Sequence, residues 1–283
     1  MRQLIIEQTP DKNGLVLLEG KDFRYLRQVL RVKAGDMIKL RLVDGRLQDS
    51  TVCKIDDNCK KITLQVCGVV REPHQPHVDP ESVEGPLIEF TLFQFIPKPQ
   101  KLELIVRQAT ECGVKNIIPV ISEYTQKGSI QALQGSKLER LERIVREARQ
   151  QSGSPTDTKV FEPVTVEEAV ELWNKIKEDA GEGKSAGFVL SERTVFAVPG
   201  PTQHSCSGGS LKLLSQFFDA RHVEGPSAVA IVCGNEGGIS PDELELLVKK
   251  GLFQPLHFSV NILRCETAAL YGIAAVQTAI LGV

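Results

Sequence analysis

The sequence predicts an α/β protein with a small N-terminal β-barrel and a larger C-terminal domain built on a mainly parallel sheet. Three observations lead to this prediction. Short strand-like stretches separated by turn residues fill the first 70 residues, a proline-rich segment follows, and capped helices then alternate with apolar strands. The length of 283 residues corresponds to about two domains. We place the domains at residues 1–72 and 87–283, with a linker at 73–86.

The N-terminal elements are short and end at turn signals such as Ala34-Gly35-Asp36 and Asp44-Gly45. Strands are expected at residues 4–7, 15–18, 37–43, 50–55 and 61–70. A short helix precedes the third strand, and its apolar face consists of Leu26, Val29, Leu30 and Val32. Several short strands at this spacing are typical of a small barrel.

Segment 71–86, REPHQPHVDPESVEGP, has the composition of an interdomain linker. It holds four prolines and one glycine and almost nothing apolar. His74 and His77 are spaced like a metal-binding pair, but no further ligand lies near them in the sequence. We interpret them as solvated linker residues and predict no metal site.

The C-terminal domain alternates strands with helices. Strands are expected at residues 88–96, 116–121, 187–190 and 228–233. Helices are expected at 101–112, after the capping boxes Ser136–Glu139, Thr165–Glu168 and Ser240–Glu243, and at 267–281. This alternation predicts a mainly parallel sheet covered by helices.

Composition excludes several classes of protein. With 41% hydrophobic and 25% charged residues the chain is an ordinary globular one, and no apolar run approaches the roughly 20 residues that cross a bilayer. The first residues lack the features of a signal peptide, so we expect a cytoplasmic protein without a membrane partner. The seven cysteines form no C-x-x-C pair, and we interpret them as reduced core thiols.

The net charge of −2 conceals an uneven distribution. Residues 1–72 carry 14 basic and 10 acidic side chains, whereas residues 151–283 carry 10 basic and 16 acidic ones. A basic first part is consistent with a polyanionic partner, although charges of this size are equally typical of a solvated surface.

The first candidate site follows the apolar strand at 228–233. The loop Gly234-Asn-Glu-Gly-Gly238 comes directly after it and leads into a capped helix. Ligands of open α/β sheets bind beyond the carboxyl ends of strands, and glycines let the backbone approach a ligand closely. A tight strand-to-helix turn explains the loop equally well, because it contains neither G-x-G-x-x-G nor a Walker lysine.

The second candidate site lies just before the last helix, in the segment PLHFSVNILRCETAA at 255–269. Glu266 and Thr267 suit the start of a helix. Arg264 gains nothing from the helix dipole at this end, so a ligand or partner explains it better.

These two segments resemble a known family. GNEGGIS, followed about twenty residues later by NILRCETAAL, resembles the GPEGG-(L/F)-S…RILR-x-ETA signature of the RsmE family. Its members are SPOUT-class methyltransferases that methylate N3 of a uridine in bacterial 16S ribosomal RNA. Residues 21–36 resemble the family's N-terminal segment, and Pro97-Lys98, 108–114, 117–120 and 147–152 resemble its middle blocks.

The resemblance implies an N-terminal PUA-like RNA-binding barrel and a C-terminal SPOUT domain with a trefoil knot that forms a pocket for S-adenosylmethionine. It also implies a homodimer acting on 16S ribosomal RNA or the small ribosomal subunit. The implied cofactor-binding residues are Leu190, Ser191, Cys233, Gly234, Glu236, Gly237, Gly238, Phe258, Ser259, Ile262, Leu263, Thr267 and Ala268. The basic residues expected to bind RNA are Arg24, Arg27, Arg31, Lys33 and Lys98.

Arg264 and Glu266 are the expected catalytic residues. Methyl transfer to nitrogen is an in-line displacement, so positioning should supply most of the catalysis, and the uracil N3–H must lose its proton. Arginine is too weak an acid to serve as the base, so Arg264 orients the uracil or stabilises charge on its oxygens. Glu266 or Glu236 accepts the proton if burial raises its pKa, and helix capping is the alternative role of Glu266.

The chain departs from the family pattern at several positions. Asn235 replaces a proline, Phe258-Ser259-Val260-Asn261 replaces Leu-Gly-x-Arg, and Ser154 stands where an arginine is usual. The lost arginines weaken the expected hold on RNA phosphate. Two other classes therefore stay open: a non-catalytic RNA-binding factor of ribosome assembly that retains the fold, and a Rossmann enzyme, which the missing glycine fingerprint disfavours.

Overall fold

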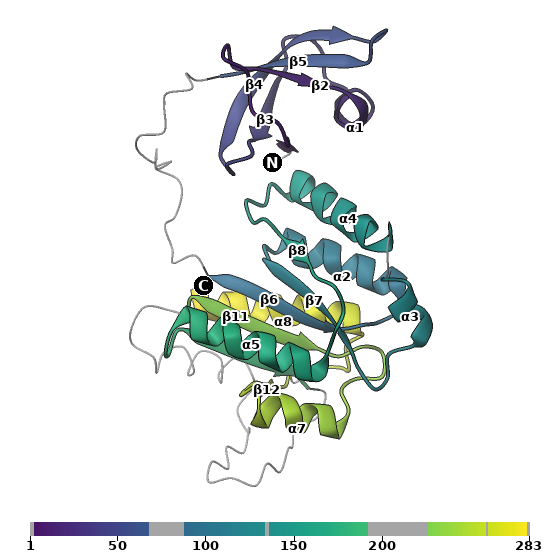
Figure 1. The fold of residues 1–283 in the computed structure, drawn as a ribbon, viewed down its shortest axis with the longest axis vertical. Helices are drawn as coiled ribbons and strands as arrows, with labels where there is room; N and C mark the ends of the chain where they lie inside the picture. The colour runs from purple at the N-terminus through teal and green to yellow at the C-terminus, as the bar shows by residue number, and fades with distance from the viewer. Residues whose placement is uncertain (1–2, 68–87, 134–135, 192–225, 259, 282–283) are drawn as a thin grey trace. The chain divides into compact units, whose positions relative to one another are not determined.

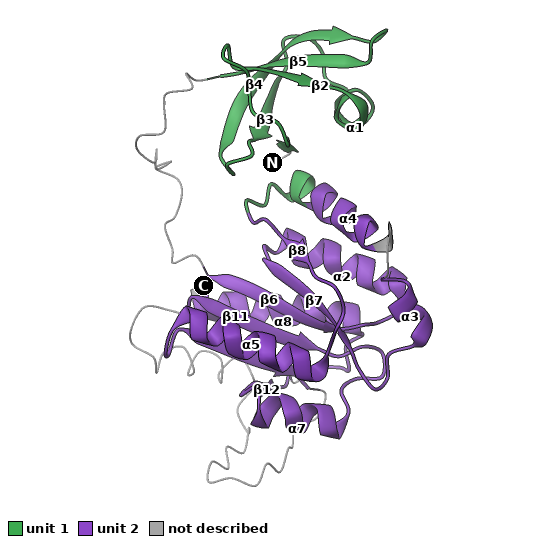
Figure 2. Ribbon diagram, viewed as in Figure 1, with its two compact units in different colours: residues 1–83, 149–155 green, residues 84–148, 156–283 purple. Residues whose placement is uncertain are grey.

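The computed structural model describes residues 3–67, 88–133, 136–191, 226–258 and 260–281. The chain divides into two compact units, residues 1–83 with 149–155 and residues 84–148 with 156–283 (Figure 2). The linker expected at 73–86 lies outside the described residues, so the domain boundaries at 72 and 87 stay a prediction. The sequence did not indicate that residues 149–155 group with the first unit.

The first unit contains a five-stranded sheet in the order β1-β3-β4-β5-β2. Figure 1 labels β2, β3, β4 and β5 of this sheet. The strands are β1 (Gln3–Ile5), β2 (Leu15–Leu18), β3 (Met37–Arg41), β4 (Leu47–Asp56) and β5 (Lys61–Val66). β1 pairs with β3 in parallel and the other pairs are antiparallel. Among the described residues β1 and β2 form the two edges, so closure into a barrel remains a prediction.

The helix expected before β3 is irregular. It consists of α1 (Gly20–Arg24) and a π-helical turn, η1 (Tyr25–Leu30), and Arg31 ends it with a φ of 54°. Leu26 is fully buried, but Val29 is 53% exposed, so its placement on the buried face was wrong. The α-helical spacing used for that prediction does not hold in a π-turn, where hydrogen bonds join residues five apart.

The second unit contains a sheet in the order β12-β10-β11-β6-β7-β8, with β9 also paired to β7. Every pair in it is parallel, as predicted. The strands are β6 (Glu89–Phe95), β7 (Asn116–Ile121), β8 (Lys159–Val160), β9 (Val164–Thr165), β10 (Ser185–Leu190), β11 (Ala228–Cys233) and β12 (Gln254–Leu256).

Helices cover both faces of this sheet (Figure 1). α2 (Pro99–Glu111), α4 (Ser136–Ser152) and α8 (Cys265–Leu281) pack on one face, and α5 (Val166–Ala180) and α7 (Pro241–Lys249) on the other. The short α3 (Lys127–Gln131) follows β7. Neighbouring strand residues alternate between the faces, so Leu92 belongs to the first core and Phe93 to the second. Burial on both sides explains why these strands are continuously apolar.

Two of the three expected capping boxes are present in the described residues. The hydroxyls of Thr165 and Ser240 accept the backbone N–H of Glu168 and Glu243, and each glutamate carboxylate accepts the N–H of its cap residue in return. The residues just before Ser136 lie outside the described part, so the third box is untested. The box at Ser240 fixes where α7 begins, directly after the Gly234–Gly238 loop.

The interpretation of the cysteines as core thiols was only partly correct. Cys233 and Cys265 are buried and Cys112 is half-buried, but Cys53, Cys59 and Cys67 are exposed. Cys53 lies at an irregularity of β4, where the pairing with β5 shifts register between Val52 and Lys54. Cys206 lies outside the described residues. No helix within the described ranges is long and apolar enough to cross a membrane.

Candidate functional site

A cavity of about 410 Å3 lies in the second unit, beyond the carboxyl ends of β10, β11 and β12. These parallel strands are neighbours, so their carboxyl ends meet at one edge of the sheet. The volume is within the roughly 300–1,000 Å3 typical of small-molecule sites. Most of the expected cofactor-binding residues line it, namely Leu190, Ser191, Cys233, Gly234, Gly237, Gly238, Phe258, Ile262, Leu263 and Ala268.

Other expected site residues do not line this cavity. The Glu236 side chain reaches α2 instead, where it contacts Lys98 and Lys101. Thr267 and Arg264 are exposed, and Arg264 lies in the chain between two lining residues. Ser259 lies outside the described residues.

Further lining residues were not among the cofactor-binding residues named from the sequence. Six of them lie within the two candidate segments, 234–238 and 255–269, namely Asn235, Leu256, His257, Val260, Asn261 and Cys265. The other four, Tyr124, Ile239, Pro241 and Leu244, lie outside those segments. Tyr124 follows β7, far away in sequence, and no motif marked it.

The glycines of the Gly234–Gly238 loop are required by close packing. A Cβ on Gly234 would lie 2.9 Å from the carbonyl carbon of Gly238, and one on Gly237 would lie 2.7 Å from the Cβ of Tyr124. Gly238 has a φ of 80°, which favours glycine. The loop therefore folds back on itself and against Tyr124, leaving its backbone at the cavity wall.

Asn235, where the family pattern has a proline, holds this loop in place. Its side chain is buried, its Nδ2 donates to Ser122 Oγ at 3.0 Å, and its Oδ1 accepts the N–H of Gly237 at 2.9 Å. Gln94 on the neighbouring strand β6 also holds the start of the loop, because its Nε2 donates to the carbonyls of Cys233 and Gly234. The departure at position 235 thus adds polar contacts to the loop.

The last helix packs directly against the cavity wall. A Cβ on Gly272 of α8 would lie 2.6 Å from Cδ1 of Leu190, which lines the cavity. The small residue allows α8 to approach β10 closely, and Cys265 at the start of the same helix also lines the cavity.

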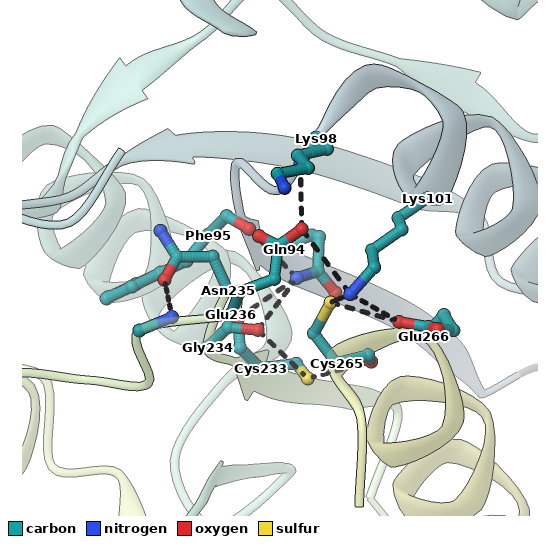
Figure 3. Close-up of polar contacts among 11 residues, drawn as sticks. Gln94, Phe95, Lys98, Lys101, Cys233, Gly234, Asn235, Glu236, Cys265 and Glu266 are labelled. Carbon is teal, nitrogen blue, oxygen red and sulfur yellow. Dashed lines mark hydrogen bonds and ion pairs between the residues drawn. The ribbon is translucent and has the colours of Figure 1, made fainter. Parts of the chain in front are cut away.

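Charged side chains from three segments form a cluster around Cys265 (Figure 3), a residue that lines the cavity. Lys101 Nζ lies 3.4 Å from Glu236 Oε1 and 3.3 Å from Glu266 Oε2. The Cys265 thiol donates to Glu266 Oε2 at 3.3 Å, and the backbone N–H of Lys98 donates to Glu236 Oε1 at 3.3 Å. This Lys101 cluster joins α2, the Gly234–Gly238 loop and the start of α8.

The environment of Glu266 does not make it a strong base. Partial burial favours its protonated form, but its own backbone N–H, Cys265 and Lys101 together hold the pKa of Glu266 below its usual value. The condition for Glu266 to act as the base, a pKa raised by burial, is therefore not met, because these hydrogen bonds and the Lys101 charge together favour the carboxylate.

Cys265 is expected to resist alkylation in the folded protein. Burial raises the pKa of its thiol to about 12, and the hydrogen bond to Glu266 adds to the rise. At pH 8 such a thiol is ionised to only about one part in 10⁴, and only the thiolate is nucleophilic. Iodoacetamide labelling followed by mass spectrometry should modify the exposed Cys53, Cys59 and Cys67 first. Labelling of Cys265 as fast as Cys67 would contradict the assigned environment, and labelling in guanidinium provides the control.

The residues expected to bind RNA differ in their surroundings. Arg24, Arg31 and Lys33 in the first unit and Lys98 in the second are exposed. Arg27 forms a two-pronged pair with Asp57 at 2.8 and 2.9 Å and donates to the carbonyl of Val32. Its guanidinium is thus already engaged within the first unit, and the RNA-binding role of all five residues stays a prediction.

Comparison with known proteins places these features in a family. The model of the RNA methyltransferase domain matches residues 83–277. Ribosomal RNA small subunit methyltransferase E of Rickettsia conorii is 27% identical over 277 residues, covering 98% of this chain and 94% of that protein. Ribosomal RNA small subunit methyltransferase E 2 of Borreliella burgdorferi is 25% identical, covering 97% and 96%.

Solved structures agree with this fold. Ribosomal RNA small subunit methyltransferase E of Neisseria gonorrhoeae, bound to S-adenosylmethionine, matches with a TM-score of 0.69 and 23% identity, covering 98% of this chain and 97% of that one. A methyltransferase of Legionella pneumophila in complex with the same cofactor matches with a TM-score of 0.67 and 20% identity, covering 98% and 96%. With the family model spanning most of the chain, this protein belongs to the RNA methyltransferase family, together with the ribosomal RNA small subunit methyltransferases E.

Proposed function

We propose that this protein transfers the methyl group of S-adenosylmethionine to N3 of a uridine in 16S ribosomal RNA of the small ribosomal subunit. One observation carries the proposal. The two segments of the family signature, at 234–240 and 261–270, come together at one cavity beyond the carboxyl ends of a parallel sheet.

The residues around the cavity fit the proposed donor. Leu190, Leu256 and Leu244 offer apolar surface for a flat adenine ring. The glycine loop presents backbone N–H and carbonyl groups, which can bind the polar edge of a base or a ribose without side-chain obstruction. These segments would hold S-adenosylmethionine, which supplies a methyl group on a positively charged sulfur.

The chain's own residues must align that methyl group with the uracil. Displacement forms the N3–carbon bond as the carbon–sulfur bond breaks, with its electron pair left on sulfur, and N3 gives up its proton to solvent water. Arg264 is the residue we assign to the uracil oxygens, since a guanidinium stays charged and stabilises developing negative charge. Glu266 is held as a carboxylate by its own backbone N–H, Cys265 and Lys101, so in this proposal it contributes negative charge beside the cavity rather than strong basicity.

The proposal includes the finer features of the family fold. The five-stranded sheet of residues 3–66 supports a PUA-like RNA-binding barrel. The meeting of residues 190–191, 233–244 and 256–268 at one cavity supports a knotted donor pocket. A homodimer acting on the small subunit completes the proposal, and light scattering after gel filtration tests that assembly.

Transfer of radiolabelled methyl groups tests the function. Purified protein, labelled S-adenosylmethionine and either assembled small subunits or naked 16S ribosomal RNA are incubated, and the RNA is digested and analysed for 3-methyluridine. Label in 3-methyluridine is the expected result. No label in either substrate would overturn the proposed activity, and RNA binding that persists without label would favour the non-catalytic assembly factor.

A further inference from the structure

Lys101 contacts two of the segments that form the cavity, although neither it nor the two glutamates it pairs with line the cavity. It lies in the first turn of α2. Its ammonium group is within 3.4 Å of Glu236 in the Gly234–Gly238 loop and of Glu266 at the start of α8 (Figure 3). One cation therefore bridges two carboxylates that belong to opposite parts of the family signature.

The surrounding contacts hold this bridge in one arrangement. The N–H of Lys98 donates to Glu236, and the Cys265 thiol donates to Glu266 while it accepts from Lys101 at 3.9 Å. The Lys101 side chain is 27% exposed and that of Glu266 15%. Burial lowers the pKa of Lys101, but Cys265 and the two glutamates raise it by more than burial lowers it. The net effect is a raised pKa, which favours the ammonium form.

Removing this cation would change the electrostatics of both walls. Glu236 and Glu266 would face each other without a counter-charge, since the other contacts described above come from a backbone N–H and a neutral thiol. Like charges at this range repel, and one of the two carboxylates takes up a proton more easily. Ion pairs that stay partly exposed contribute little to stability, so the consequence expected here is a change of cavity geometry rather than unfolding.

We propose that Lys101 is a positioning residue that sets the distance between the two walls of the donor cavity and thereby the affinity for S-adenosylmethionine. This inference rests on the proposed function. Lys101 acts through Glu236 and Glu266 and touches neither the donor nor the uracil.

Calorimetric binding of S-adenosylmethionine to Lys101→Met and Lys101→Arg tests the inference. At pH 7.5 the methionine variant should bind the donor about tenfold more weakly and the arginine variant within about twofold of the wild type, because arginine keeps the charge. Lys115→Met is the matched control. Lys115 pairs with Glu89 at the amino end of β6, whereas the cavity lies at the carboxyl ends of the strands. The Lys115→Met variant should therefore bind the donor like the wild type.

Two further readouts separate positioning from a merely structural role. Donor affinity of Lys101→Met should recover toward the wild-type value as the pH is lowered from 8 to 6, because a proton taken up by one of the two carboxylates relieves their repulsion, whereas that of the wild type should stay flat. In a Glu236→Gln/Glu266→Gln background, Lys101→Met should have little additional effect. Lys101→Gln replaces Lys101→Met if circular dichroism shows that the methionine variant does not fold.

The outcomes are distinguishable. Wild-type affinity in the folded Lys101→Met variant, or a full additional loss in the double-glutamine background, overturns the role of Lys101. Absence of S-adenosylmethionine binding in the wild type overturns the proposed function instead.

Discussion

The Arg264→Ala variant is expected to lose methyl transfer by about 10²- to 10³-fold in kcat, the usual effect of removing a group that stabilises developing charge, while its affinity for S-adenosylmethionine stays unchanged. Arg264 is exposed between the cavity residues Leu263 and Cys265. Its carbonyl accepts the N–H groups of Thr267 and Ala268 at 2.9 and 2.7 Å, so the backbone that carries the guanidinium is held at the start of α8.

Single-turnover kinetics with small subunits and saturating donor measure this effect. Arg264→Lys keeps the charge but not the planar fork, so we expect an intermediate rate. Arg140→Ala is the control, because Arg140 pairs with Glu103 away from the cavity. A wild-type kcat in the Arg264→Ala variant would contradict the proposal that Arg264 stabilises charge on the uracil oxygens.

The Gly234→Ala variant is expected to lose donor binding by about 100-fold or more, because a misplacement of about 1 Å is enough to cost that much. The added Cβ would meet the carbonyl carbon of Gly238 at 2.9 Å and its Cα and oxygen at 3.1 Å. All three contacts are backbone atoms, so no side chain can rotate away, and the loop that forms the cavity wall must open instead.

Calorimetry with S-adenosylmethionine measures this loss, and Gly128→Ala is the matched control. Gly128 lies in α3, and a Cβ there would meet no atom within 4 Å. The control should bind the donor normally. Gly237→Ala should also weaken donor binding, because its nearest neighbour at 2.7 Å is the Cβ of Tyr124, which is fixed to the backbone and cannot rotate away. Tight donor binding by Gly234→Ala would show that the loop is not part of the donor site.

The strands and helices around the site were predictable because their signals are local. Ala228–Cys233 is apolar throughout and its strand is buried on both faces, and the Ser240–Glu243 pattern forms the expected capping box. The glycine loop between them was also placed correctly at a strand end. Each of these patterns depends on contacts between residues only a few positions apart.

The parts that could not be predicted depend on contacts between distant segments. Lys101 and Glu266 are 165 positions apart, and neither residue type in isolation indicates a pair. Tyr124 carries no motif, and it became part of the site only because β7 places it against Gly237. The pKa of Glu266 depends in part on such a contact, because its own backbone N–H and Cys265 lower it together with the distant Lys101.

The close packing of Gly272 on Leu190 has a consequence for the order of folding. The cavity draws its walls from β10, β11 and both ends of the segment 256–272, so it is complete only after α8 has docked on the sheet. The chain between β10 and α8 must close into a loop before the contacts between them can stabilise the fold, which makes the docking of α8 a slow step. A ligand that binds only the finished cavity shifts the equilibrium toward the native chain by mass action. Donor supply and completion of the fold are therefore thermodynamically linked through the last helix.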